Sequence, residues 1–135
     1  MLFAAIMIFC IAAIFGLIIL SAILKNLPTP KLYVFWHGPI ALLGLMLVFV
    51  TIYYGPKDPL LIASAVLFVL AALGGLTLFT IDMSRKRIPK LLAIGHPILA
   101  VIALILLIMY VWSYKPSLTN IYTVGEGAAV SVNDL

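Results

Sequence analysis

Four long stretches of apolar residues, separated by short polar loops, make up most of this chain. They run from Leu2 to Leu24, from Pro30 to about Tyr54, from Leu60 to about Ile81 and from Pro89 to Trp112 or Tyr114. At 1.5 Å per residue, each is long enough to cross the ~30 Å hydrocarbon core of a bilayer. With 66% hydrophobic and 9% charged residues, the chain also has too little polar surface for a soluble domain of 135 residues. The sequence therefore predicts an all-α membrane protein, a four-helix transmembrane bundle whose first partner is the lipid bilayer.

Charge and cysteine content exclude other classes of protein. The net charge of +4 comes from basic residues in short loops, so no nucleic-acid partner is expected. The single cysteine, Cys10, permits neither an internal disulfide nor a Cys-x-x-Cys-His haem attachment motif. Because no basic residue precedes the first apolar stretch, we expect it to be a retained helix and not a secretory signal peptide.

The basic residues also predict how the bundle is oriented. Positive charge is concentrated in cytoplasmic loops of membrane proteins. The side with the first and third loops is the more basic, and this places both termini outside a bacterial-type inner (plasma) membrane, with the polar residues 115–135 as an extracytoplasmic tail or short hairpin. Six basic residues lie on that side, Lys25, Lys31, Arg85, Lys86, Arg87 and Lys90, against Lys57 and Lys115 on the other.

Proline, glycine and threonine mark where the second and third helices are expected to begin. Thr29 followed by Pro30 is typical of an N-cap and a first helical position. The segment 55–59, Gly-Pro-Lys-Asp-Pro, is expected to be a turn between the second and third stretches.

An internal repeat relates the two halves of the chain. Shifting the sequence by 59 residues gives 14 identities in the 56 pairs that begin at residue 1, and rare residue types coincide, including Pro-Lys-Leu at 30–32 and 89–91. A bundle over residues 1–114 is thus predicted to consist of two tandem helical hairpins, repeat 1 at about 1–56 and repeat 2 at about 60–115. Because each hairpin crosses twice, the repeat is parallel, with a pseudo-two-fold axis along the membrane normal.

The only two histidines, His37 and His96, occupy the same position in the two repeats. Each lies seven residues after a proline, about 10 Å along its helix, inside an uncharged apolar run. An ionisable residue inside a membrane span is costly and indicates function. Two at one depth, on helices related by the repeat, predict a site.

The spacing of small residues predicts which helix faces line that site. Phe9, Ala12, Ala13 and Gly16 follow i, i+3, i+4, i+7 spacing, and the equivalent residues 68, 71, 72 and 75 do the same. We expect both stripes to face the bundle axis, near the depth of the histidines. By themselves, small residues four apart indicate only close helix packing.

Counting ligands favours haem. Zinc requires three or four protein ligands, and non-haem iron requires two histidines with a carboxylate, yet the predicted spans contain no carboxylate. Haem supplies four nitrogens and requires only two axial ligands, for which His37 and His96 on diagonal helices are the candidates. The sequence predicts one haem b per chain. Gly16 and Gly75 are expected to leave room for the cofactor. The histidine rings are expected to be oriented by Ser21 and Thr80, or by the carbonyls of Phe35 and Ala93, which lose their helical hydrogen bonds because of the prolines. The haem propionates are expected to pair with basic residues, for which the candidates are Lys31, Lys90, Arg85 and Arg87.

With two histidines facing each other in four spans, the chain resembles the four-helix transmembrane b-type cytochromes, of the broad kind that includes cytochrome b561. The resemblance is one of architecture only and implies electron transfer or a membrane oxidoreductase, with a quinol or a redox protein as partner. Those proteins commonly hold two haems, whereas this sequence has histidines for one, near the cytoplasmic face.

Two other readings of the histidine pair stay open at this point. The pair can belong to a small transporter or channel in which it protonates or passes a metal ion such as Cu(I). The bundle can also be an accessory subunit packed against a larger complex. A homo-oligomer is a separate partner that the sequence leaves open. No catalytic residue is predicted in any of these readings.

Overall fold

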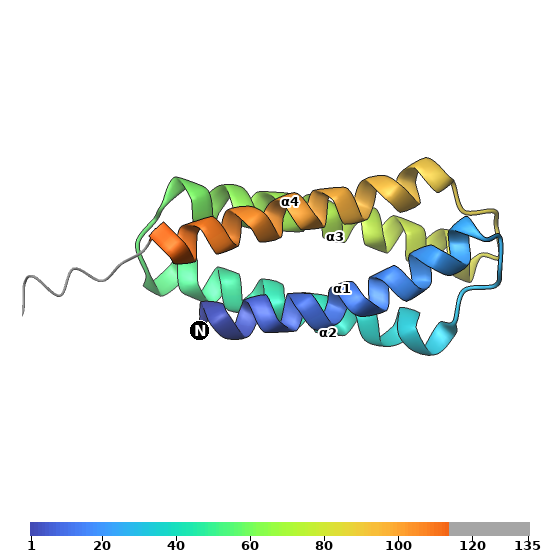
Figure 1. The fold of residues 1–135 in the computed structure, drawn as a ribbon, viewed down its shortest axis with the longest axis horizontal. Coiled ribbons are helices and arrows are strands. Elements are labelled where there is room, and N and C mark those ends of the chain that lie inside the picture. Colours follow the sequence, from blue (N-terminus) through green and yellow to red (C-terminus); the bar gives the residue numbers. More distant parts are fainter. Residues whose placement is uncertain (114–135) are drawn as a thin grey trace, which may run out of the picture.

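The computed structural model describes residues 1–113 and consists of four helices in an elongated bundle (Figure 1). The helices are α1 (Leu2–Leu24), α2 (Lys31–Tyr54), α3 (Pro59–Met83) and α4 (Lys90–Ser113). All four are long and apolar enough to cross a membrane. The predicted all-α four-helix bundle is therefore confirmed, whereas Tyr114 and the predicted tail at 115–135 lie outside the described residues.

The order of packing makes α2 and α4 diagonal neighbours. Helix α1 packs on α2 and α3 packs on α4, and the two hairpins meet through α1 with α4 and through α2 with α3. The turns at 25–30 and 84–89 lie together at one end of the bundle, which we call the basic end (Figure 1). The turn at 55–58 and the N-terminus lie at the other end, called the far end.

Helices α1 and α3 end in the same turn at repeat-related positions. Asn26 and Arg85 adopt left-handed backbone conformations, with φ of 54° and 55°. The Leu27 amide donates to the Ala22 carbonyl at 2.9 Å, and the second hairpin makes the same bond one repeat later at 3.2 Å. This is the Schellman arrangement, which satisfies carbonyl groups left free at the end of a helix. The two hairpins thus turn alike although their loop sequences differ.

Helix α3 begins at Pro59, inside the segment 55–59 expected to be a turn, and it has a side-chain cap that was not predicted from the sequence. Asp58 caps α3 by accepting a hydrogen bond from the Leu60 amide at 2.8 Å, with a proline in the first turn. The expected cap of α2 by Thr29 is wrong, because α2 has Pro30 at the N-cap position and no side-chain cap bond. The Thr29 hydroxyl instead donates to Asp82 at 2.7 Å, a contact between the hairpins that the local sequence does not encode.

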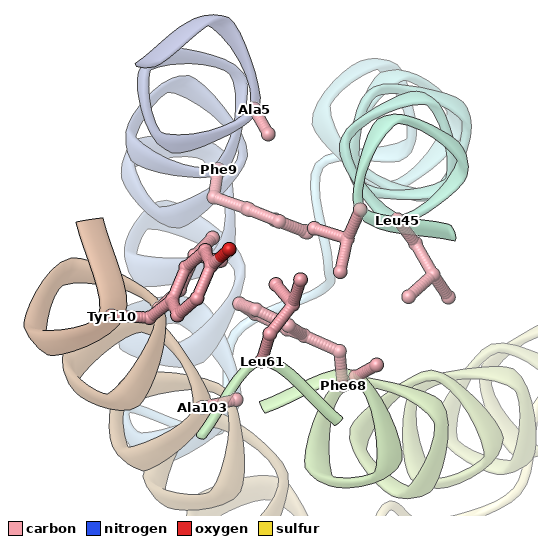
Figure 2. Packing of buried hydrophobic residues seen from close by; sticks show 10 residues of the cluster. Ala5, Phe9, Leu45, Leu61, Phe68, Ala103 and Tyr110 are labelled. Carbon is pink, nitrogen blue, oxygen red and sulfur yellow. The ribbon is translucent and has the colours of Figure 1, made fainter. Parts of the chain in front are cut away.

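The apolar core occupies the half of the bundle nearest the far end. At its centre the rings of Phe9 and Phe68, a repeat-related pair, stack with centroids 4.0 Å apart and planes 6° from parallel. Figure 2 shows these rings between the four helices, with Tyr110 and Leu61 beside them. The buried members of this core are Ala5, Phe9, Leu45, Val48, Leu61, Ala65, Phe68, Ala103, Leu107 and Tyr110.

The half nearest the basic end is packed much less completely. Among residues 13–24, 31–43, 72–83 and 90–102, only Ala22 and Ala93 are buried. The prediction that Ala13 and Ala72 face the bundle axis is wrong, since both are exposed. No large apolar side chain of these segments is buried, and the two histidines lie in this half.

Gly44 is required where α2 meets the Phe9 ring. A Cβ atom at position 44 would lie 3.0 to 3.2 Å from three atoms of that ring, which cannot retreat because Phe68 stacks against it. We expect Gly44→Ala to destabilise the bundle by about 1–3 kcal/mol through overpacking. The measurement is unfolding of the detergent-solubilised protein. The control is Gly38→Ala on the same helix, where a Cβ meets nothing within 4 Å and helix propensity should increase stability. Equal effects of the two variants would contradict this account.

Candidate functional site

The fold brings the two histidines together. His37 on α2 and His96 on α4 lie on diagonal helices, and their ring centroids are 6.1 Å apart with planes at 79°. Both rings are partly buried. The pairing arises because each histidine is the seventh residue of its helix, and both helices begin at the basic end.

Each imidazole is held by a backbone carbonyl of its own hairpin. His37 Nδ1 donates to the Ala12 carbonyl of α1 at 2.9 Å, and His96 Nδ1 donates to the Ala71 carbonyl of α3 at 2.8 Å. A carbonyl oxygen only accepts, so the Nδ1 atom carries the proton in both rings. In the neutral imidazole, Nε2 then keeps its lone pair and is available as a ligand atom.

Gly16 and Gly75 form the surfaces on which the two rings rest. A Cβ atom at position 16 would lie 3.1 Å from His37 Cε1, and one at position 75 would lie 3.0 Å from His96 Cε1. Each glycine is four residues after the alanine whose carbonyl binds the ring, and therefore lies on the same helix face one turn later. In each Ala-x-x-x-Gly pattern, the alanine carbonyl accepts a hydrogen bond from the imidazole and the glycine leaves room for the ring. The clearance predicted for a cofactor is, in this structure, clearance for the histidine rings.

The predicted orienting hydroxyls do not reach the histidines. Ser21 donates to the Ile18 carbonyl at 2.8 Å and Thr80 donates to the Leu76 carbonyl at 2.6 Å, each within its own helix. Both residues are exposed. The rings are oriented by carbonyls of α1 and α3, and not by the Phe35 and Ala93 carbonyls that the prolines free. Sequence reasoning missed this because any residue type supplies a backbone carbonyl.

Two of the predicted basic residues connect the hairpins. Lys31 makes an ion pair with Asp82 at 2.7 Å, reaching from α2 to the end of α3. Lys90, its repeat equivalent, reaches from α4 to the end of α1 and donates to the Leu24 carbonyl at 3.3 Å. The other two, Arg85 and Arg87, line a cleft of about 890 Å³ between the loops at the basic end. The four predicted cations are therefore gathered at one end, above the histidines.

The described part of the chain places few potential metal ligands near the two histidines. Within residues 1–113, no group of three or more His, Cys, Asp or Glu side chains is placed to hold a metal ion. A bare metal ion between the histidines would receive only two ligands from the described side chains, fewer than zinc or non-haem iron requires. A ligand that brings its own equatorial donors requires no more than these two.

Comparison with known proteins identifies no relative. No protein-family model, no curated protein and no solved structure matches the chain. The resemblance to b-type cytochromes therefore gains no support from these comparisons. The established class is that of a four-helix bundle with membrane-spanning dimensions, and a function has to be argued from the histidine pair.

Proposed function

We propose that the chain is a membrane haem b protein in which His37 and His96 are the axial ligands of one haem. The observation that carries the proposal is the spacing of the two rings. Imidazoles that bind one metal ion from opposite sides, with metal–nitrogen bonds of about 2 Å, have centroids roughly 6 Å apart. The centroids here are 6.1 Å apart.

The surroundings of the rings support the same ligand. Histidines that bind metal through one nitrogen almost always donate the other N–H to a carboxylate or carbonyl, which fixes the tautomer and the ring orientation. Both rings make such a bond, to the carbonyls of Ala12 and Ala71. A bundle can hold a large flat cofactor only where its core is not already filled by side chains. The sparse packing of the basic half meets this requirement.

The residues of this chain would determine which chemistry the site performs. Haem supplies one-electron oxidation and reduction, and two histidines on one iron leave no axial position open for a gas or substrate. Lys31 and Lys90 each begin a helix six residues before a histidine, about 9 Å along the axis, and are the cations nearest to it on that helix. These two lysines are the first candidates for binding the haem propionates. Lys31 would bind a propionate while it also keeps its ion pair with Asp82.

The proposed setting is a bacterial-type inner membrane with the basic end in the cytoplasm. This orientation rests on the distribution of lysine and arginine between the two ends. The electron donor or acceptor would then be a quinol or a redox protein that approaches from the cytoplasmic side. With ligands for a single haem, the chain by itself would exchange electrons at that side only.

A reduced-minus-oxidised absorbance spectrum of the detergent-purified protein tests the proposal. We expect the sharp reduced bands of a six-coordinate b-type haem, with one haem per chain by pyridine haemochrome assay. A protein that is colourless and takes up no added haemin would contradict it. Colourless protein with pH-dependent or Cu(I)-dependent flux in liposomes would favour a transporter in which the two histidines line the pathway.

A further inference from the structure

The cleft at the basic end has the composition of an anion site. It lies between the turns that follow α1 and α3, and both turns contribute to its walls. Its volume is about 890 Å³, within the range of small-molecule sites in proteins. Its charged lining residues are Lys31, Asp82, Arg85, Lys86, Arg87 and Lys90.

The residues that line the cleft carry more positive than negative charge. Asp82 is the one acidic residue among the lining residues, and it is already bound by Lys31 at 2.7 Å and by the Thr29 hydroxyl. Among residues 1–113, that ion pair is the only one. Arg85, Lys86 and Arg87 therefore form a run of three cations with no acidic partner in the described part of the chain. Positive charge of this density in one concave site favours an anion with several acceptor oxygens.

The position and the apolar lining of the cleft indicate which kind of anion. The cleft lies where α1 and α3 end and α2 and α4 begin, which is the depth of lipid headgroups for helices that span a bilayer. Ile23, Leu27 and Ile88 line it together with the cations. Basic pockets between transmembrane helices bind the headgroups of anionic lipids. A phosphodiester with attached acyl chains matches both the charged and the apolar residues, whereas a free phosphate matches the charged residues alone.

We propose that the cleft binds the phosphate group of an anionic phospholipid, with Arg85 and Arg87 as its principal ligands. Arginine is suited to this role because its planar guanidinium donates two parallel hydrogen bonds to phosphate oxygens. The left-handed backbone at Arg85 reverses the chain at the end of α3 and sets the next residues along the cleft wall. The cleft shares Lys31 and Lys90 with the proposed propionate contacts, but the phosphate is assigned to Arg85 and Arg87, and lipid binding does not require haem.

The test compares lipid binding by variants of the full chain in detergent. Phosphatidylglycerol and phosphatidylcholine are titrated separately, and bound lipid is counted by native mass spectrometry. We expect Arg85→Gln with Arg87→Gln to weaken phosphatidylglycerol binding roughly 25-fold, from about fivefold per cation. The matched control is Lys25→Gln, which removes one positive charge at the same end from an exposed residue outside the cleft. It should change binding less than twofold.

Two outcomes would overturn the proposal. Equal weakening by Lys25→Gln and by Arg87→Gln alone would mean that general surface charge, and not the cleft, attracts the lipid. Glycerol phosphate that displaces phosphatidylglycerol at equal concentration would mean that the acyl chains contribute nothing to binding. Size-exclusion chromatography of each variant verifies that it is folded. None of these readouts uses a pigment, so failure of the haem proposal leaves the test intact.

Discussion

Replacing His37 and His96 together by alanine should abolish haem binding, and replacing either one alone should convert the spectrum from six-coordinate to five-coordinate. The physical reason is that the described residues place no third His, Cys, Asp or Glu side chain at the site to replace the lost ligand. A single variant should bind haem more weakly than the unmodified protein, and the haem that it keeps should be five-coordinate. The measurement is the absorbance spectrum with a haem assay per chain.

Chemical rescue provides the control for this experiment. His96→Gly leaves a space where the ring was, and added imidazole should occupy it and restore the six-coordinate bands. A variant that is merely misfolded would not respond to imidazole. If both single variants keep the spectrum of the unmodified protein, the two histidines are not the ligands and the proposed function is wrong.

Replacing Gly16 and Gly75 by alanine should weaken haem binding almost as strongly as replacing a histidine. In Gly16→Ala and Gly75→Ala the new Cβ atom would lie 3.1 and 3.0 Å from a histidine Cε1 atom. To relieve this contact the ring must move away from the helix, which lengthens its hydrogen bond to the Ala12 or Ala71 carbonyl. We expect the double variant to bind haem 10- to 100-fold more weakly, the usual range for loss of a supporting contact around a metal ligand.

Two other glycines on the histidine-bearing helices provide a control with the same chemical change. Gly38 and Gly95 are each adjacent in sequence to a histidine, and a Cβ atom at either meets nothing within 4 Å. Gly38→Ala and Gly95→Ala should therefore leave haem binding unchanged and raise helix stability by roughly 0.5–1 kcal/mol. Haem loss in all four variants would show that the site responds to helix stiffness and not to contact with the rings.

The helices were the most predictable part of this protein. All four lie within about two residues of the predicted spans, because uncharged runs of this length have no other stable form in a bilayer. The stripes of small residues were predicted less well. Ala12 and Ala71 are buried as expected, but Ala13 and Ala72 are exposed, since spacing alone leaves the exact rotation of a helix undetermined. Gly44, against which Phe9 packs, has alanine at its repeat equivalent and was not predicted.

At the site, the sequence predicted which side chains meet but not what holds them. His37 and His96 were paired from the repeat alone, and their rings do lie side by side. The supporting carbonyls of Ala12 and Ala71 carry no signal in residue type. The only sequence feature that accompanies these carbonyls is a glycine four residues later, and this pattern is equally consistent with ordinary helix packing. Contacts between hairpins, such as Thr29 with Asp82, depend on tertiary geometry that no local pattern contains.

The contacts of Lys31 and Lys90 make the two hairpins unequal. Lys31 finds a carboxylate on α3, whereas Lys90 finds only a main-chain oxygen on α1, because Ile23 stands where the second repeat has Asp82. A chain assembled from two copies of the first hairpin would lack the acid, and one assembled from two copies of the second would carry it twice. The two halves are thus not interchangeable, and the ion pair between Lys31 and Asp82 requires the first hairpin to precede the second.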